Sequence, residues 1–189
     1  MIEDLVKSNR SCRRFFEDEP ISRETLKWLV NLARLSASAA NLQPLKYFLA
    51  HTPNLNAKIF SCLAWAGYLQ DWPGPAAGER PSAYLIILGD REITTNLGCD
   101  HGIAAQSILL GARAKGLAGC MLGSIQRDQL RSSLHLPERY EILLVLALGK
   151  PKEKVVLEEI PPDGSIKYWR GEKDIHHVPK RRLEDIILS

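Results

Sequence analysis

The chain has 189 residues, of which 45% are apolar and 7% aromatic, and it carries 25 Lys and Arg against 22 Asp and Glu. A domain of this length can bury about 70% of the surface of its unfolded chain, so the composition excludes a disordered chain, a collagen-like repeat and a disulfide-dependent miniprotein. The formal net charge of +3 is too small to favour nucleic acid as the partner.

The cysteines and the apolar runs indicate a cytoplasmic protein. Cys12, Cys62, Cys99 and Cys120 are far apart and form no Cys-x-x-Cys pair, so we expect reduced thiols. The first residues include early acids and no long apolar stretch, unlike a signal peptide. The longest aliphatic run, 142–148, is well below the roughly 20 residues of a membrane-spanning helix.

The first third of the chain predicts two helices and a loop of unusual composition. A short helix over 2–8 precedes a basic segment, and Ser22 is a good N-cap for a helix that runs through Leu26 to Ala33. Residues 36–44 are mostly small, and Pro44 disfavours helix at Gln43. We interpret this segment as a loop whose backbone a ligand or another chain can approach.

The middle of the chain alternates irregularly between strands and helices. We expect strands at 46–50, 83–88, 117–122 and 142–148, helices at 54–64, 97–115 and 127–134, and a long loop at 67–81. The helix over 97–115 is rich in Gly, Ala and Ser, which fits either a central core helix or a dimer axis. This order favours an α+β fold with a mixed sheet flanked by helices over a doubly wound fold.

The composition changes after Pro151. Residues 152–189 combine prolines and charges with a late apolar group, too little to fold alone. We therefore divide the chain into a domain over 1–151 and a C-terminal arm over 152–189, which completes the domain and docks on it or on a partner subunit.

The common catalytic and metal-binding motifs are missing from the sequence. There is no dinucleotide fingerprint, phosphate loop, nucleophile elbow or His-Glu-x-x-His. His176 and His177 are adjacent and would face opposite sides of an extended segment, so we expect no metal site. Asp100-His101 is better explained as a helix terminus than as an acid–base pair. We nominate no catalytic residue.

Two basic clusters lie at opposite ends of the chain: Arg10, Arg13 and Arg14, and Lys180, Arg181 and Arg182. Guanidinium groups bind phosphate oxygens in a bidentate manner, and a Lys adds a compact charge. If the clusters converge, they form a phosphate site; if they do not, each is a solvated face.

Four segments in order resemble the nitroreductase-like flavoproteins. Asn9-Arg10-Ser11-Cys12-Arg13-Arg14-Phe15 resembles the family's Arg-Arg-Ser-x-Arg-x-Phe, and Ser36-Ala37-Ser38-Ala39-Ala40-Asn41-Leu42-Gln43-Pro44 resembles its Pro-Ser-x-x-Asn-x-Gln-Pro-Trp. Asp100-His101-Gly102-Ile103-Ala104-Ala105-Gln106, with 116–119 and 121–123, is similar to its central helix and flavin-edge strand. Pro179-Lys180-Arg181-Arg182-Leu183 is similar to its closing Pro-Lys-x-Arg-Leu.

The resemblance implies an intertwined homodimer with two FMN sites at the subunit interface. By position, the phosphate and its neighbourhood would be held by Arg10, Ser11, Arg13, Lys180 and Arg182. The other subunit would contribute Ser38, Ala39, Asn41 and Gln43, while the flavin ring would be lined by Met121, Leu122 and Gly123. Arg13 would also lie near the pyrimidine edge, where positive charge favours the reduced anionic flavin.

Some positions depart from the family pattern. Asn9 stands in place of the first Arg, Ala37 in place of a Pro and Leu45 in place of a Trp. The Lys and Asn by which some relatives reach the flavin have no counterpart within 68–74, where Trp72 is a candidate for shaping the substrate pocket.

The implied activity is an FMN-dependent NAD(P)H oxidoreductase that reduces an electron-poor acceptor, such as a nitroaromatic or a quinone, by a ping-pong mechanism. Specificity would reside in the 67–81 loop. Two alternatives stay open: another flavin reaction on the same fold, such as reductive dehalogenation or oxidative flavin breakdown, and a dimer that stores or senses flavin without turnover. A nucleic-acid surface is disfavoured by the balanced charge.

Overall fold

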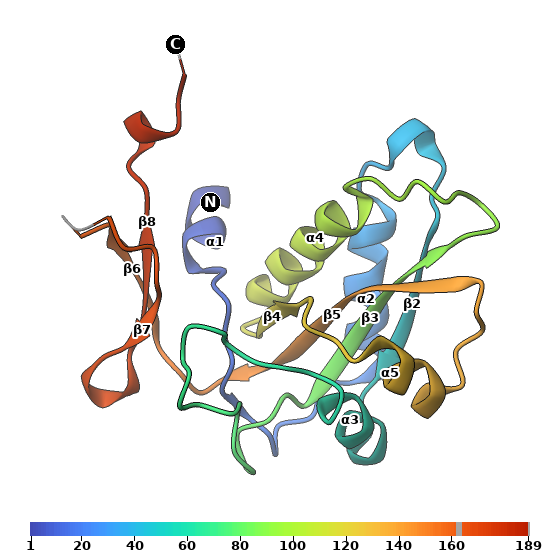
Figure 1. The fold of residues 1–189 in the computed structure, drawn as a ribbon, viewed down its shortest axis with the longest axis horizontal. Coiled ribbons are helices and arrows are strands. Elements are labelled where there is room, and N and C mark those ends of the chain that lie inside the picture. The colour runs from blue at the N-terminus through green and yellow to red at the C-terminus, as the bar shows by residue number, and fades with distance from the viewer. Residues whose placement is uncertain (162–163, 189) are drawn as a thin grey trace.

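A computed structural model describes residues 1–161 and 164–188 of the chain (Figure 1). Its helices are α1 (Ile2–Ser8), α2 (Arg23–Arg34), α3 (Pro53–Phe60), α4 (Asp100–Ala114) and α5 (Arg127–Leu134). Its strands are β1 (Phe15–Phe16), β2 (Leu45–Ala50), β3 (Ala83–Asp90), β4 (Ala118–Leu122), β5 (Tyr140–Pro151), β6 (Val155–Glu159), β7 (Trp169–Arg170) and β8 (His176–Lys180). None of these helices is long and apolar enough to cross a membrane.

The central sheet has the strand order β1-β5-β3-β2, and β4 also pairs with β5. Its ladders are antiparallel, and parallel pairing occurs at an isolated bridge between Ser11 and Gly119 and between β6 and β8 of the arm. Every residue of β3 is buried, as its unbroken apolar run predicts for a strand covered on both faces. The predicted α+β fold is confirmed.

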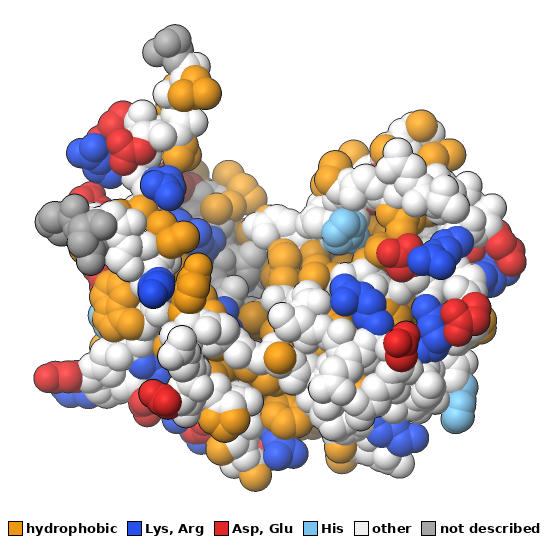
Figure 2. All heavy atoms as spheres, in the orientation of Figure 1, with side chains coloured by type: hydrophobic (Ala, Val, Ile, Leu, Met, Phe, Trp, Pro, Cys, Tyr) orange, Lys and Arg blue, Asp and Glu red, His pale blue; other side chains and the backbone are white. Residues whose placement is uncertain are grey.

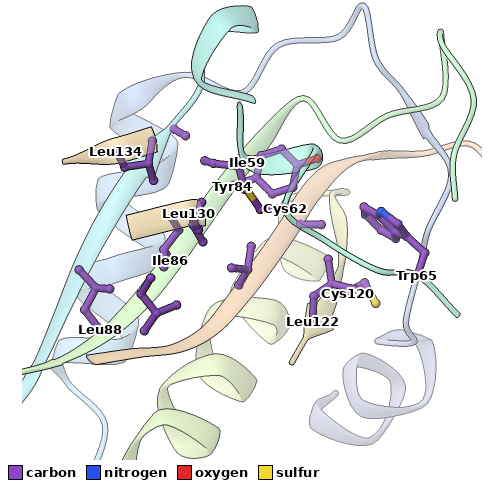
Figure 3. Close-up of a cluster of buried hydrophobic side chains, with 14 of the residues drawn as sticks. Ile59, Cys62, Trp65, Tyr84, Ile86, Leu88, Cys120, Leu122, Leu130 and Leu134 are labelled. Atoms are coloured by element: carbon purple, nitrogen blue, oxygen red, sulfur yellow. The ribbon is translucent and has the colours of Figure 1, made fainter. Parts of the chain in front are cut away.

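Helices cover both faces of the sheet and create two cores. On one face Leu85, Ile87 and Leu146 pack against α2 and α4. On the other face Tyr84 and Ile86 pack against α3 and α5 (Figure 3). Alternate side chains of the same strand therefore point into opposite cores, as the two-residue period of a strand requires.

Strands β3 and β5 are longer than the predicted 83–88 and 142–148, and two helices differ from their predicted bounds. Ser22 caps α2, since its hydroxyl accepts a hydrogen bond from the Thr25 N–H at 3.1 Å. The helix predicted over 54–64 ends at Phe60 because the chain beyond it exchanges backbone hydrogen bonds with the segment after β4, Ala64 N with Ser124 O and Gln126 N with Cys62 O. The predicted start of α4 at Leu97 shifts to Asp100, after a positive φ of 47° at Gly98.

The arm forms a small sheet of its own, in the order β6-β8-β7, which stands beside α1 at one side of the molecule (Figure 1). Lys152 N donates to Arg14 O at 2.9 Å, and the Arg170 guanidinium lies 4.1 Å from the centre of the Trp72 ring. Through these contacts the arm touches both the basic segment near the N-terminus and the 67–81 loop. Docking of the arm on a partner subunit stays a prediction.

Candidate functional site

A cavity of about 290 Å³ lies where the arm meets the domain. We call it the arm cavity. Figure 2 shows this face hollowed between the arm and the rest of the molecule. Its lining comes from the segment before β1, from α4, from β4 and from the arm: Asn9, Arg10, Ser11, Arg13, Gln106, Leu109, Met121, Tyr168, His176, Val178 and Lys180. The two ends of the chain therefore converge here.

The basic segment reaches the cavity because it docks on the edge of β4. Ser11 forms a parallel bridge with Gly119, and Cys12 N donates to Gly119 O at 3.0 Å. A Cβ at Gly119 would lie 2.6 Å from the carbonyl oxygen of Ala147, so only glycine fits between these backbones. This close packing places Ser11 in the same cavity lining as Met121.

Arg13 is the most enclosed cation of the cavity, with 9% of its surface exposed. Its Nη1 lies 3.1 Å from His176 Nε2, and its guanidinium lies 4.8 Å from the centre of the Tyr168 ring. Its backbone N–H donates to the Glu153 carboxylate. Arg13 therefore binds the arm to the domain and also lines the cavity.

Among the residues that line the arm cavity, two guanidinium N–H groups have no hydrogen-bond partner in the described part of the chain. These are Arg10 Nε and Arg13 Nε, both buried, although Arg10 Nη2 donates to Val6 O at 2.7 Å. Lys180 adds a third cation to the lining and Ser11 adds a hydroxyl. This donor set fits a phosphate group, whose oxygens accept charge-assisted hydrogen bonds.

His176 is a site residue that our sequence reasoning missed. Its side chain is buried, 1% exposed, and burial together with the charges of Arg13 and Arg170 lowers its pKa to about 4. The ring is therefore neutral at pH 7. The neighbouring His177 instead contacts Glu158 at 2.7 Å and stacks on Trp169, so the two rings do face opposite sides of β8. Strand alternation was the available signal.

Two of the remaining cations of the clusters, Arg14 and Arg182, are paired elsewhere. Arg14 donates to Glu79 at 2.6 and 2.7 Å and contacts Asp174 at 2.9 Å. The hydrogen bonds from Arg14, together with Lys152, hold the pKa of Glu79 down to about 2. Arg182 is exposed and pairs with Glu184 and Asp185. Arg14 thus ties the 67–81 loop to the arm, and Lys180 is the residue of the second cluster that lines the arm cavity.

The loop at 36–44 lies at the other end of α4, against the buried carboxylate of Asp100. Ser38 Oγ donates to it at 2.6 Å and Ala39 N at 3.0 Å, while Gln43 N donates to Ser38 Oγ at 2.9 Å. Asn41 is exposed with a positive φ of 54°. Ser38 and Gln43 line a separate cavity of about 150 Å³. Within one chain, this loop does not line the arm cavity.

Three residues predicted beside the flavin ring have different surroundings. Met121 lines the arm cavity, Leu122 is buried in the core below it, and Gly123 is exposed after β4. Trp72 packs against the Arg170 guanidinium and against the core that lies between the sheet and helices α3 and α5. These placements leave the flavin-ring contacts and the substrate pocket as predictions.

Comparisons with known proteins agree on one family. The model of the nitroreductase family matches residues 6–150. The chain is 24% identical to a Bacillus subtilis (strain 168) protein provisionally named NAD(P)H nitroreductase YodC, over 88% of this chain and 97% of that protein. It is 26% identical to the 5,6-dimethylbenzimidazole synthase of Rhodospirillum rubrum, over 95% and 93%.

A solved structure shows the same fold. The FMN-dependent nitroreductase of Clostridium difficile R20291 superposes with a TM-score of 0.68 at 21% identity, covering 82% of this chain and 89% of that one. The family model spans most of the chain, from within α1 to the end of β5, and includes the residues that bring Ser11 against Gly119. The chain therefore belongs to the nitroreductase family of oxidoreductases.

Proposed function

We propose that the protein binds FMN in the arm cavity and acts as an NAD(P)H oxidoreductase on an electron-poor acceptor such as a nitroaromatic or a quinone. The observation that carries this proposal is the convergence of Arg10, Arg13 and Lys180 on one cavity, with two guanidinium N–H groups left without partners. Such a donor set favours a ligand that carries a phosphate group.

The lining residues divide the cavity by chemistry. Arg10, Ser11, Arg13 and Lys180 would hold the phosphate of the ribityl chain. The apolar side chains of Leu109, Met121 and Val178 would lie along less polar parts of the cofactor. Arg182 would join the phosphate site if its pairing with Glu184 and Asp185 opens.

When bound, FMN supplies the redox chemistry: it accepts hydride from a reduced nicotinamide and passes electrons to the acceptor that next occupies the same pocket. The residues of this chain bind, orient and set the charge around it. Arg13 provides a fixed positive charge, while the neutral His176 adds none at pH 7. We assign no residue a catalytic proton transfer.

We further propose that the site is completed by a second copy of the chain. Ser38, Ala39, Asn41 and Gln43 are held at the end of α4 remote from β4, and three of the loop's residues adopt positive φ: Ala40, Asn41 and Gln43. Non-glycine residues in this conformation are strained and gather at functional sites. A partner subunit would present this rigid loop to the flavin.

The first test is the visible absorption spectrum of the purified protein under anaerobic conditions. We expect a flavin spectrum that bleaches on addition of NADH or NADPH and recovers on addition of a nitroaromatic or a quinone. Flavin that nicotinamide does not bleach would favour a dimer that stores or senses flavin. Colourless protein that fails to bind added FMN would contradict the flavoprotein assignment.

A variant of Lys180 tests the phosphate site without disturbing the core, because its side chain is exposed. Lys180→Gln removes one charge-assisted contact, worth about 1.5–3 kcal/mol, so FMN affinity falls about tenfold or more. The melting temperature of the FMN-free protein stays unchanged. Lys58→Gln on α3 is the matched control, and equal affinity in both variants would place the phosphate elsewhere.

Oxidative flavin breakdown is a second candidate, supported by the 26% identity to a 5,6-dimethylbenzimidazole synthase over nearly the whole chain. The dimethylbenzene ring of that product also occurs in flavins. Mass spectrometry of FMN incubated with the protein, reduced nicotinamide and oxygen decides between the two. Release of dimethylbenzimidazole supports this candidate, and intact FMN after many turnovers eliminates it.

A further inference from the structure

A second cavity, of about 140 Å³, lies on the opposite face of the sheet from α4. We call it the α3 cavity. It is lined by residues before α2, by α3 and by the start of β3: Glu17, Pro20, His51, Pro53, Asn56, Ala57, Phe60, Arg80, Pro81, Ser82 and Tyr84. It shares no lining residue with the arm cavity.

Four polar atoms of this lining are buried without a hydrogen-bond partner among the described residues. They are Asn56 Oδ1, Arg80 Nε, Ser82 Oγ and Tyr84 Oη. Tyr84 is 0% exposed and Ser82 is 6% exposed, so bulk water does not reach either side chain. A buried polar group is normally satisfied, and four such groups around one cavity indicate that something else supplies their partners.

The lining of the α3 cavity contains one cation, Arg80, and one carboxylate, Glu17. The Arg80 guanidinium lies 4.4 Å from the centre of the Phe60 ring and forms no ion pair with a carboxylate of the described residues. Glu17 contributes a negative charge, but its Oε2 accepts the backbone N–H of Gly78 at 2.6 Å and of Arg80 at 3.2 Å. The cation is therefore available to an external anion.

The hydroxyl groups add donors beside that cation. Burial raises the pKa of Tyr84 above its usual range, so the phenol keeps its proton and can donate. Ser82 can donate as well, whereas Asn56 Oδ1 is an acceptor, because Asn56 Nδ2 already donates to Ser82 O at 2.8 Å. The residues that carry these three donors and one acceptor line a space whose other walls include Phe60 and three prolines.

We propose that the α3 cavity binds a small organic carboxylate that carries a neighbouring hydroxyl or amino group. The carboxylate accepts hydrogen bonds from Arg80, Ser82 and Tyr84, the neighbouring group donates to Asn56, and the apolar body lies against Phe60. A cavity of this volume holds on the order of ten water-sized atoms, which sets the size of the ligand.

The test uses mandelate as the probe, because it combines a carboxylate, an adjacent hydroxyl and an apolar ring. The matched uncharged compound is 1-phenylethane-1,2-diol, in which a hydroxymethyl group replaces the carboxylate. Binding is measured by calorimetry on the protein as purified. We expect saturable binding of mandelate and at least tenfold weaker binding of the diol. Equal affinities, or no saturable binding of mandelate, would overturn the proposal.

Two variants locate the binding. We expect mandelate binding to weaken about tenfold in Arg80→Gln and in Tyr84→Phe. Two control variants should leave it unchanged: Lys180→Gln in the arm cavity and Tyr140→Phe at the far end of the β3–β5 ladder. Wild-type affinity in both cavity variants overturns the assignment. Loss of binding in Lys180→Gln alone places mandelate in the arm cavity and overturns it as well.

Tyr84→Phe gives a second readout that does not depend on the probe. It removes a buried hydroxyl that has no protein partner and keeps the ring that packs beside Ile59 and Cys62 (Figure 3). We expect the ligand-free variant to unfold at a higher denaturant concentration than the wild type, since the unsatisfied hydroxyl is gone. A lower midpoint would mean that the hydroxyl has a structural partner and would contradict a ligand role.

Discussion

Arg13 joins two tasks in one side chain. It lines the arm cavity, and through His176, Tyr168 and Glu153 it also holds the arm against the domain. Truncating it would therefore lower both FMN occupancy and stability, so a loss of flavin in Arg13→Ala would not identify the phosphate site. Lys180 is exposed and separates the two effects.

His176 makes stability depend on pH. Its pKa is about 4 in the folded state and 6.5 when unperturbed, so between these values the unfolded chain binds the extra proton and stability falls as the pH is lowered. From pH 7 to pH 5 the loss is about 2 kcal/mol. Glu79 acts in the same direction at lower pH: its folded pKa is about 2, so its contribution to stability is lost as the pH falls from about 4.5 to about 2.

Urea unfolding of the FMN-free protein at pH 7 and pH 5, at one fixed protein concentration, measures this difference. His176→Asn should remove it. His135→Asn is the control, because His135 is an exposed residue of positive φ at the end of α5, a conformation that Asn tolerates. A pH dependence retained in His176→Asn would assign the effect to another group.

At the scale of elements, β4 packs so closely against its neighbours that there is no room for a side chain at Gly119. A Cβ at Gly119 would lie 2.6 Å from both Ala147 O and Leu109 Cδ2. Gly119→Ala should therefore destabilise the fold by roughly 1–3 kcal/mol, as overpacking does. Gly67→Ala meets nothing within 4 Å and should leave stability unchanged or slightly raised. Equal unfolding midpoints would show that β4 adjusts freely.

The loop at 36–44 stores strain that a glycine would release. Ala40 has a φ of 49°, which costs an L-residue about 1–2 kcal/mol. Ala40→Gly should raise the free energy of unfolding by about 1 kcal/mol after the entropy of the unfolded glycine is subtracted. Ala57→Gly, at an exposed position of α3, should lower it by about the same amount. A loss in both variants would mean that the loop relaxes in solution.

At the scale of the molecule, α4 has two faces with different neighbours. Ala104, Ala105 and Ile108 are buried against α2 and the sheet, which confirms the interpretation as a core helix. Gly102 and Ile103 are exposed on the same helix, and the arm ends in an exposed apolar group: Leu183, Ile186, Ile187 and Leu188. Both surfaces are candidates for burial against a second copy of the chain.

We predict that the protein sediments as a dimer and that Ile103→Asp, which places a charge on the exposed face of α4, shifts it to a monomer at micromolar concentration. FMN binding should weaken together with dimerisation, because residues 38–43 would come from the partner. Ile93→Asp, equally exposed but in the segment between β3 and α4, should remain a dimer. A monomeric wild type that binds FMN fully would refute the shared site.

Features that depend on neighbours along the chain could be predicted from the order of the amino acids. Hydrophobic periodicity and the N-cap Ser22 predicted α2, and an unbroken apolar run predicted the buried strand β3. The order of helices and strands predicted the α+β fold, and four ordered motifs indicated the family. It also nominated Arg10, Ser11, Arg13, Met121 and Lys180, which the structure brings into one cavity.

Which charged side chains are already paired could be read only from the folded chain. Arg14 belongs to a cluster that resembled a phosphate site, yet its guanidinium is already paired with Glu79 and Asp174. His176 was considered only as one of two adjacent histidines that make no metal site, yet it lies buried beside Arg13. Asn56 of α3 joins Arg80, Ser82 and Tyr84 in one cavity lining only because α3 packs beside the start of β3. Hydrogen bonds and burial depend on distant partners, and no local pattern encodes those.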